Sequence, residues 1–369
     1  MKEDNIAGES LKESAEELEG GRKAPLWKRL MGLALRYLVP LLLTVALVWY
    51  MFQKVDFSDM MDIIRHGANY YWILCAMGIS VLSHVCRAAR WRLQLKALGI
   101  KPPFMALCCS IFGCYALNLV FPRLGEVWRC TYISNRQKAP FTTVLGSMVA
   151  DRLADTVMVG LLTVLTFVVA TRAINDFLVK YPIGKDLVEL VSNPMFWIVI
   201  GAGVLIVWCM FYFLRHTSVI KKVREWTGQL WQGFTAVLHM EGRGMFLVYT
   251  LAIWSCYFIQ LYVAFYAFSF TAALCHEQGL AWGLVPCLVA FVLSSIGMAV
   301  PSNGGLGPWN IAVMFGLAVY GISDQDGTAF SMLQWSGQTV MLIILGIYTM
   351  IYISLSNPSR KKGNAEAHV

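Results

Sequence analysis

The strongest constraint on this chain is a series of apolar runs, each close to the length that crosses a bilayer. Residues 104–121 and 195–214 carry no charge, and no charged residue interrupts the stretch 278–323. A helix needs about 20 predominantly apolar residues to cross the hydrocarbon core. With 57% hydrophobic and only 14% charged residues among 369, the chain is predicted to be an all-α, polytopic membrane helical bundle.

Lys and Arg gather beside the ends of these apolar runs, as the positive-inside bias requires of cytoplasmic segments. Basic clusters at residues 22–36, 87–101, 215–224 and 360–362 are therefore predicted to lie in the cytoplasm. This places both termini there, in a multi-pass protein of the inner (plasma) membrane. The net charge of +8 is explained by this bias and does not indicate nucleic-acid binding.

One membrane domain is predicted between two tails. The polar start of the chain predicts a disordered cytoplasmic tail over 1–30, followed by the transmembrane domain over 31–356 and a basic cytoplasmic tail over 357–369. Within the domain, residues 216–244 are predicted to form an amphipathic helix on the inner surface. The ten cysteines form no C-x-x-C pair or Cys/His cluster, so no metal, cofactor or disulfide is expected.

The basic clusters also restrict how often the chain crosses the membrane, because an even number of crossings must separate two cytoplasmic clusters. Two re-entrant hairpins satisfy this rule. The first is residues 104–121, entering from the cytoplasm and breaking at Pro122–Gly125; the second enters from outside and breaks at Pro301–Pro308. Broken segments that enter from opposite faces, as in an inverted repeat, would meet near the midplane. The six full spans are then 33–52, 70–86, 142–171, 195–214, 245–272 and 332–356; eight full spans are the alternative.

The first break carries an unusual group of polar residues, Asn118, Arg123, Glu126 and Arg129, between two apolar segments. Irregular backbone is tolerated at membrane depth only where protein or a watery cavity surrounds it. Charges that alternate with apolar residues beside a Pro-x-x-Gly break favour such a site. An ordinary solvated loop is the other interpretation.

A second polar cluster, A-D-R-L-A-D, lies inside the apolar segment 142–171. Asp151 and Asp155 are four residues apart and share a helical face, and Arg152 is spaced to pair with Asp155. A charge inside a transmembrane helix costs roughly 2.5–3.5 kcal/mol on insertion scales and normally faces the bundle interior. The cluster is predicted to serve a lipid headgroup or an ion pathway; a structural ion pair between two helices is the alternative.

Arg87, Arg90 and Trp91 are predicted to end the second span at the cytoplasmic interface. Basic residues and Trp at an interface commonly serve as snorkelling anchors. Arg87 and Arg90 are three residues apart on one helical face, and guanidinium groups match phosphate well. The second interpretation is therefore phosphate binding, in which Arg123 points at the same headgroup.

The second break, S-N-G-G-L-G-P-W-N, contains Pro308, and proline is favoured at the first position of a helix. Exposed N–H groups at such a helix start can hold an anion. Gly304, Gly305, Gly307 and Asn310 are therefore predicted to belong to the site. Close helix packing is the alternative role of the glycines.

Four motifs support a resemblance to a known family. They are R-x-x-R-W at Arg87–Trp91, N-x-x-x-P-R-x-G-E at Asn118–Glu126, D-R-x-x-D at Asp151–Asp155 and P-S-x-G-G-L-G at Pro301–Gly307. Through them, residues 30–356 resemble the lysylphosphatidylglycerol synthase transmembrane family, a flippase-like integral membrane domain. The resemblance implies movement of lipids between leaflets, including aminoacylated phosphatidylglycerol, and relatives have been linked to polyprenyl-linked lipids.

Two features of the sequence bear on how far this resemblance reaches. Asn310 stands where the family often has an acidic residue, which argues against a proton or cation role there. The chain ends at Val369, where the aminoacyl-transferring domain of two-domain members would follow. No lysylphosphatidylglycerol synthesis is therefore expected, and motifs such as H-E-x-x-H or G-x-S-x-G do not occur.

The leading prediction is a non-enzymatic protein that binds the phosphate-bearing headgroup of a membrane lipid and moves the lipid across the bilayer. Its cargo would be an anionic phospholipid or a polyprenyl-linked lipid. Arginines would contact phosphate, carboxylates would orient them or bind a cationic headgroup, and the glycines would let a cavity open. The predicted lipid-binding residues are Arg87, Arg90, Asn118, Arg123, Glu126, Arg129, Asp151, Arg152, Asp155, Gly304, Gly305, Gly307 and Asn310. A membrane enzyme acting on a lipid-linked substrate and a regulatory or scaffolding membrane protein are the alternatives.

Overall fold

The computed structural model describes residues 57–171 and 240–356, together with the isolated residues 228, 231 and 235. Every regular element in these ranges is helical. The predicted spans 33–52 and 195–214 lie outside the described residues, as do both tails and most of the predicted amphipathic helix.

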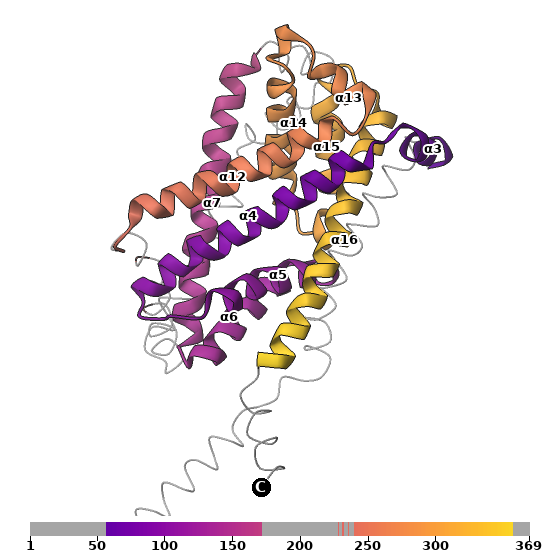
Figure 1. The fold of residues 1–369 in the computed structure, drawn as a ribbon. Coiled ribbons are helices and arrows are strands. Elements are labelled where there is room, and N and C mark those ends of the chain that lie inside the picture. Colours follow the sequence, from indigo (N-terminus) through magenta and orange to yellow (C-terminus); the bar gives the residue numbers. More distant parts are fainter. Residues whose placement is uncertain (1–56, 172–227, 229–230, 232–234, 236–239, 357–369) are drawn as a thin grey trace, which may run out of the picture.

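Ten α-helices make up the described part of the chain (Figure 1). They are α3 (Phe57–Gly67), α4 (Tyr70–Ala97), α5 (Phe104–Val120), α6 (Leu124–Gln137), α7 (Phe141–Val169), α12 (Arg243–Phe265), α13 (Ser269–Leu274), α14 (Leu284–Gly297), α15 (Pro308–Ala318) and α16 (Asp324–Ser356). Two short 3₁₀ turns, η1 (Gln278–Leu280) and η2 (Asn303–Gly305), connect some of them. Five stretches are long and apolar enough to cross a membrane: α4, α7, α12, Gln278–Gly297 and α16. The prediction of a polytopic helical membrane protein is confirmed.

Helix α4 continues well beyond the predicted end of the second span. Asn69 caps its start by accepting a hydrogen bond from the Tyr71 N–H at 3.1 Å. The helix then runs to Ala97 instead of ending near residue 86. Arg87 and Arg90 do not end it, because both lie on its buried face. The charged residues therefore do not mark the end of this helix.

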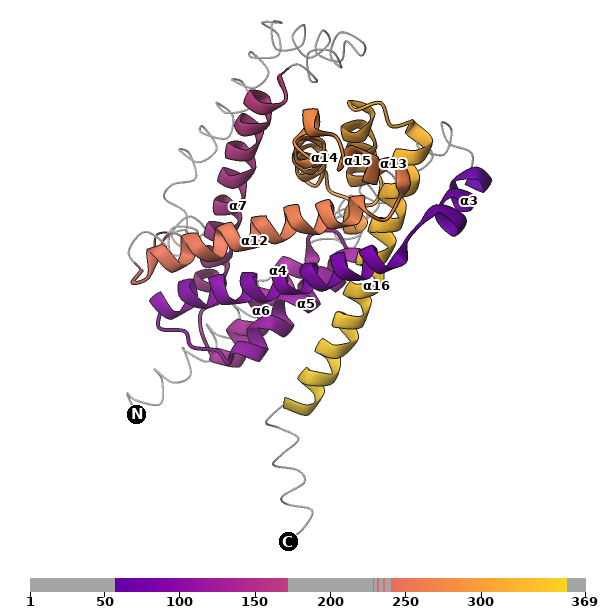
Figure 2. The same ribbon diagram turned by 45° about the horizontal axis from the view of Figure 1, so that its top comes forward.

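The interior contains two apolar clusters, to which α4 contributes from successive parts of its length. One joins α4 to α12, α14, α15 and α16, with the rings of Phe265, Phe268 and Phe330 at its centre. The other packs α4 against α5, α6 and α7 around Trp91 and Ile111. Helices α4 and α12 lie side by side, as Figures 1 and 2 show from two directions. Helix α4 therefore joins the two clusters, with residues 73–77 in the first and residues 88–95 in the second.

Helices α5 and α6 form the first predicted hairpin. Helix α5 ends at Val120, and α6 begins at Leu124 after Arg123, whose backbone is left-handed (φ 60°). Gly125 is already helical and packs so closely on α5 that a Cβ atom there would overlap the Cys114 carbonyl oxygen. The two helices fold back on each other, and the break spans Phe121–Arg123 and not Pro122–Gly125. That the hairpin enters and leaves the membrane on the cytoplasmic side stays a prediction.

Helices α14 and α15 form the second hairpin in the same way. A Cβ atom on Gly297 of α14 would lie 2.8 Å from the Pro308 carbonyl oxygen of α15. The break between the two helices contains Gly304, Gly305 and Gly307, with φ angles of 57°, 83° and 90°. Side chains other than glycine rarely adopt such angles, so the glycines are needed for the turn itself.

The two breaks contact each other. Asn303 Nδ2 in the second break donates to the Val120 carbonyl at the end of α5, at 3.0 Å. In return, Arg123 Nη2 in the first break donates to the Ala299 carbonyl, also at 3.0 Å. Each hairpin also packs on the long helix that follows it and on the long helix of the other half: α7 lies on α14, and α16 on α5. The predicted meeting of the breaks is observed; their depth in the bilayer stays a prediction.

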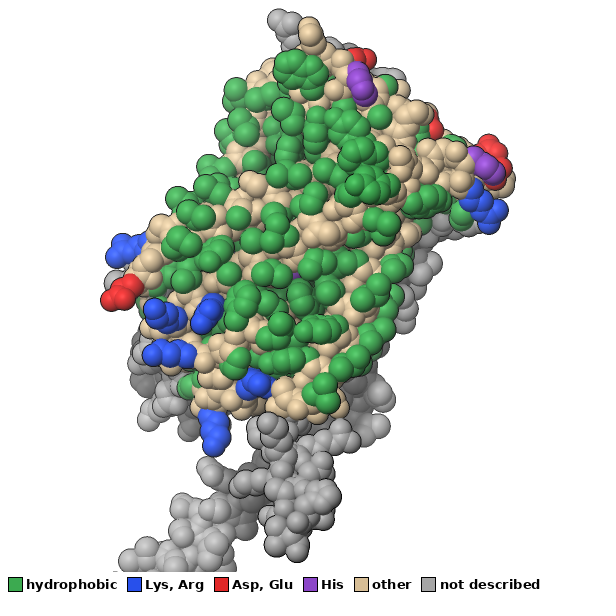
Figure 3. Space-filling model, viewed as in Figure 1, with side chains coloured by type: hydrophobic (Ala, Val, Ile, Leu, Met, Phe, Trp, Pro, Cys, Tyr) green, Lys and Arg blue, Asp and Glu red, His purple; other side chains and the backbone are tan. Residues whose placement is uncertain are grey.

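The outer face of the bundle has the character of a lipid-facing surface. Figure 3 shows hydrophobic side chains spread over α4, α12 and α16, with Lys and Arg gathered where α4 ends and α12 begins. On α7, large apolar side chains recur every three or four residues and are exposed, including Val157, Leu161 and Val168. Such continuous apolar exposure on spans of this length is typical of contact with lipid.

Candidate functional site

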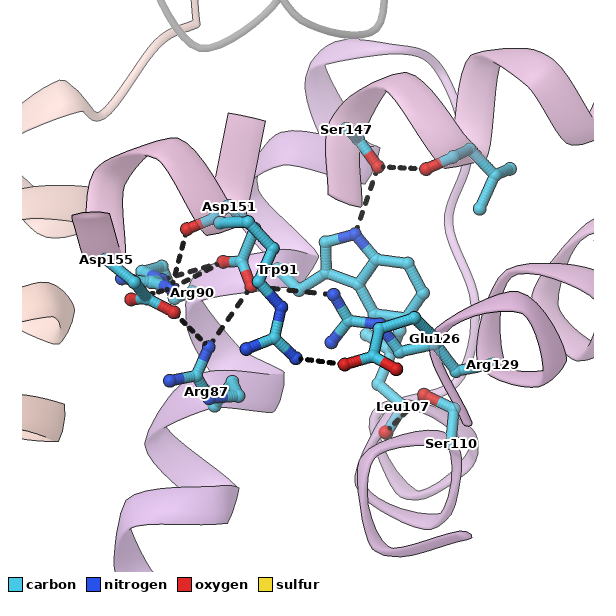
Figure 4. A network of polar contacts seen from close by, with 12 residues as sticks. Arg87, Arg90, Trp91, Leu107, Ser110, Glu126, Arg129, Ser147, Asp151 and Asp155 are labelled. Atoms are coloured by element: carbon cyan, nitrogen blue, oxygen red, sulfur yellow. Dashed lines mark hydrogen bonds and ion pairs between the residues drawn. The ribbon is translucent and has the colours of Figure 1, made fainter. Parts of the chain in front are cut away.

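A buried cluster of ionised side chains joins α4, α6 and α7 (Figure 4). Helix α4 contributes Arg87 and Arg90, which are three residues apart and project on one face. Helix α7 contributes Asp151 and Asp155, which share a face because they are four residues apart. Arg129 comes from α6, the returning limb of the first hairpin. The arginines of α4 and the aspartates of α7 are at least 61 positions apart in the sequence, so only the fold brings them together.

Each aspartate contacts both arginines of α4. Arg90 Nη2 lies 2.7 Å from Asp151 Oδ1 and 2.8 Å from Asp155 Oδ1. Arg87 Nη1 lies 2.7 Å from Asp155 Oδ2 and 3.3 Å from Asp151 Oδ2. Arg87, Arg90 and Asp151 are almost completely buried, while the Asp155 side chain is 13% exposed. Carboxylates and guanidinium groups in this crossed arrangement compensate one another's charge away from water.

Helix α12 closes the other side of the cluster. Arg90 Nη1 donates to Thr250 Oγ1 at 3.2 Å, and Arg87 Nη2 donates to the Tyr257 hydroxyl at 3.2 Å. The Arg90 guanidinium also lies over the ring of Phe246, 5.4 Å from its centroid. The α4 arginines are thus held by carboxylates on α7 and by neutral groups on α12.

Arg129 is held differently from the other arginines. It is fully buried, and its ion-pair contact is with Asp151, whose Oδ2 lies 3.6 Å from Arg129 Nη2. Its guanidinium lies over the Trp91 ring, 4.7 Å from the centroid, and the Trp91 Nε1–H is fixed by Ser147 Oγ at 3.0 Å. None of its three guanidinium nitrogens has a hydrogen-bond partner in the described part of the chain. Arg129 therefore offers donors that this conformation does not use.

The half-exposed edge of the cluster is the ion pair between Glu126 and Arg152, at 3.0 Å with side chains 18% and 36% exposed. Asn118 braces it, since Nδ2 donates to Glu126 Oε2 at 3.2 Å and Oδ1 accepts from the Gly125 N–H at 2.8 Å. The predicted pairing of Arg152 with Asp155 is wrong. Arg152 points from α7 towards α6, because consecutive helix positions face different directions.

The structure gathers eight of the predicted site residues at this one place. They are Arg87, Arg90, Asn118, Glu126, Arg129, Asp151, Arg152 and Asp155. The interpretation of Arg87, Arg90 and Trp91 as snorkelling anchors is wrong, because all three are buried in the bundle. Four arginines face three carboxylates, so the seven charged side chains carry one net positive charge.

The remaining predicted residues lie at or beside the two breaks. Arg123 is exposed, and its guanidinium lies on the Ala299 carbonyl rather than beside Arg87. Asn310 is fully buried and accepts from the Gly307 N–H at 3.1 Å, while its Nδ2 contacts Ser331 Oγ at 3.5 Å. The Gly307 N–H, one of the groups predicted to hold an anion, is therefore already bonded in this conformation.

Sequence reasoning missed the neutral partners of the cluster. Thr250 and Tyr257 are seven residues apart on α12, which is two helical turns, and so face the same side. This spacing could have indicated a shared polar face. Thr and Tyr are uncharged and common in membrane helices, however, so the spacing alone does not single them out. Their role is visible only once α12 is seen to lie along α4.

A bundle of membrane-length helices, with two helical hairpins and a buried ion cluster between them, defines a polytopic membrane protein with a polar site in its interior. Comparison with known families then places it. The family described as the lysylphosphatidylglycerol synthase TM region matches residues 37–346, and the chain belongs to this family. The resemblance inferred from the four motifs is confirmed.

Two curated relatives match the chain. The UPF0104 membrane protein MJ1595 of Methanocaldococcus jannaschii is 19% identical over 320 residues, which cover 80% of this chain and 89% of that protein. The glycosyltransferase AglD of Haloferax volcanii is 30% identical over 139 residues, covering 37% of this chain but only 22% of AglD. The first match extends over most of both proteins; the second is confined to a part of each.

Proposed function

We propose that this protein binds the phosphate of an anionic lipid headgroup at the buried arginine cluster and moves the lipid between leaflets. The observation that carries the proposal is Arg129, a buried guanidinium that makes no hydrogen bond and one long ion-pair contact, with Asp151 at 3.6 Å, in a cluster with one net positive charge. A buried charge normally has a partner. A phosphodiester supplies both missing parts, a single negative charge and oxygens that accept from a guanidinium fork.

The position of the half-exposed pair supports lipid as the source of this phosphate. Glu126 and Arg152 lie between α6 and α7, beside Val149 and Leu153 on the exposed apolar face of α7. A lipid could keep its chains against that face while its headgroup replaces the pair and reaches Arg129. Neighbouring helices that end in breaks provide backbone that can rearrange at membrane depth.

The proposal is tested by reconstituting the protein in vesicles that contain a fluorescent anionic phospholipid and measuring its transfer between leaflets. Arg129→Gln should lower the transfer rate by about tenfold or more, because a charge-assisted hydrogen bond contributes about 1.5–3 kcal/mol. Arg65→Gln, on an exposed arginine of α3, is the matched control and should transfer like wild type. Transfer at the wild-type rate by Arg129→Gln would remove this site from the mechanism.

Stability separates loss of the site from loss of the fold. Arg129 makes no hydrogen bond in the described structure, and its ion-pair contact with Asp151, at 3.6 Å, is the longest in the cluster. Replacing it with a neutral residue is expected to leave the free energy of unfolding unchanged or slightly raised. Arg129→Gln is therefore expected to lose lipid transfer while keeping the stability of the wild type.

The partial match to a protein named as a glycosyltransferase favours a membrane enzyme as the second candidate. Glu126, Asp151 or Asp155 would then act as acid–base groups on a lipid-linked substrate. All three are occupied by arginines in this conformation, which favours the transport proposal. Mass spectrometry of lipids incubated with the protein distinguishes the two, since an enzyme changes their chemical composition and a flippase only their distribution.

A further inference from the structure

The polar face of α4 does not stop at the arginines. Ser80, His84, Arg87 and Arg90 follow one another at three- or four-residue spacing, and none of them is more than 2% exposed. Such a stripe along a membrane helix requires polar partners along its whole length, because lipid supplies none. The arginines have theirs on α7 and α12. Ser80 and His84, nearer the start of α4, lie beside different groups.

Ser80 meets its partners at a junction of three helices. Ser80 Oγ donates to Gln338 Oε1 of α16 at 3.1 Å, and Gln260 Nε2 of α12 donates to the same oxygen at 3.0 Å. Gln338 Nε2 in turn lies 3.0 Å from Ser80 Oγ. Both glutamines are only partly buried. This junction is hydrogen-bonded within the protein and fixes α4, α12 and α16 relative to one another.

His84 lies between this junction and the arginines and has no such partner. It is 2% exposed, and neither ring nitrogen has a hydrogen-bond partner in the described part of the chain. Its ring is tilted against Tyr115 at 4.5 Å between centroids and meets the edge of Phe112 at 6.4 Å. These contacts fix the plane of the imidazole but use neither nitrogen. Buried polar groups left this way are rare in native structures.

The chemistry of His84 indicates what would satisfy it. A neutral imidazole has one N–H donor and one acceptor nitrogen, which matches a hydroxyl group, itself both donor and acceptor. His84 precedes Arg87 by three residues, a separation of about 4.5 Å along a helix axis. A cation at His84 would be repelled by Arg87, and a second phosphate there would meet no positive charge on the neutral imidazole. A neutral hydroxyl beside a phosphate fits both positions.

We propose that His84 is a hydroxyl-binding position of the headgroup site and selects lipids whose phosphate carries a polyol or a sugar. The buried arginine cluster holds the phosphate, and His84, one helical turn before Arg87 on α4, bonds a hydroxyl of the group esterified to it. The hydrogen bonds among Ser80, Gln260 and Gln338 hold α12 and α16 against α4 beside this position. The inference rests on the proposed function for the phosphate site, but it concerns which headgroups are chosen.

The test compares two lipids that share the phosphate and differ in the hydroxyl-bearing group. Binding of phosphatidylinositol and of phosphatidylmethanol, a phosphodiester with the same single charge and no hydroxyl group, to the detergent-solubilised protein is measured by native mass spectrometry, and transfer of fluorescent forms of both is measured in vesicles. Wild type should prefer phosphatidylinositol by about threefold to tenfold, the range that one hydrogen bond of ordinary net strength provides. His84→Phe should bring this ratio close to one while leaving phosphatidylmethanol binding nearly unchanged.

Two further variants keep the result interpretable. His84→Gln retains a donor and an acceptor and should keep part of the preference. Ser83→Ala removes a neighbouring buried hydroxyl that bonds only the Ser80 carbonyl of its own helix, and should behave like wild type. If His84→Phe weakens both lipids equally, or if wild type shows no preference, the inference is wrong. Selective binding without transfer would instead refute the transport proposal and leave the His84 position standing.

Discussion

Replacing Asp151 by asparagine should destabilise the protein more than any other single isosteric change in the ion cluster. Asp151 is fully buried and is the one residue of the described cluster that contacts three arginines, Arg87, Arg90 and Arg129. Asparagine keeps the shape of the side chain but removes its charge. The cluster would then hold four positive and two negative side chains, one more uncompensated charge than in the wild type.

The size of the effect follows from the contacts that are lost. Asp151 accepts two side-chain hydrogen bonds from charged donors, from Arg90 Nε at 2.8 Å and Arg87 Nη1 at 3.3 Å. Bonds of this kind contribute about 1.5–3 kcal/mol each, and breaking a buried ion pair costs about 3–5 kcal/mol. Because such terms overlap, Asp151→Asn is expected to lower the free energy of unfolding by about 3–5 kcal/mol.

Asp155→Asn provides the matched comparison. Asp155 contacts only Arg87 and Arg90, and its side chain is 13% exposed, so water can partly replace the lost contacts. Its loss should be smaller than that of Asp151→Asn. A double-mutant cycle between Asp151→Asn and Arg90→Gln should show a coupling energy of about 0.5–3 kcal/mol.

Steric trapping or titration with sodium dodecyl sulfate, both in detergent micelles, would measure these free energies. The reasoning fails if Asp151→Asn unfolds within about 0.5 kcal/mol of wild type, the range of an ordinary surface substitution. It also fails if Asp155→Asn is the more damaging change, because the order follows directly from burial and from the number of arginines contacted.

Three further outcomes are expected. Gly125→Ala should sharply reduce the yield of folded protein in size-exclusion chromatography, since a Cβ atom there overlaps the backbone of α5, whereas Gly160→Ala, with nothing within 4 Å, should not. Trp335→Phe removes a 3.0 Å hydrogen bond to a carbonyl in the second break and should lower the free energy of unfolding by about 1 kcal/mol. Single cysteines at Leu124 and Leu306, in a background without other cysteines, should react with an impermeant thiol reagent from the cytoplasm and from outside respectively. Reaction of both cysteines from the same side of the membrane would contradict the two opposed hairpins.

The breaks in the fold could be predicted because their causes are local. Pro122, Pro301 and Pro308 cannot continue a helix in the ordinary way, and three of the glycines between the last two adopt positive φ angles. Run length and hydropathy likewise predict membrane helices without reference to tertiary structure. These features depend on neighbouring residues alone, so the sequence is sufficient for them.

The ion cluster could be predicted only in part, because its partners come from distant segments. Charges at Arg87 and Arg90 suggested the edge of the membrane, since a sequence does not reveal that carboxylates on α7 meet them. For Arg152, the helical spacing to Asp155 did not predict the partner. Its position on α7 turns it towards Glu126 on α6, and that choice depends on how the first hairpin packs.

The reciprocal hydrogen bonds between the two breaks restrict how the molecule can change shape. The Val120 and Ala299 carbonyls lie at or just beyond helix ends, where carbonyls lack partners within the helix, and each is satisfied by a side chain of the opposite hairpin. Pulling the hairpins apart would leave both carbonyls bare, and in hydrocarbon each would cost several kcal/mol. A rotation that keeps the two tips together avoids this cost. The crossing of the tips would then act as a pivot, about which opening on one side of the bundle accompanies closing on the other.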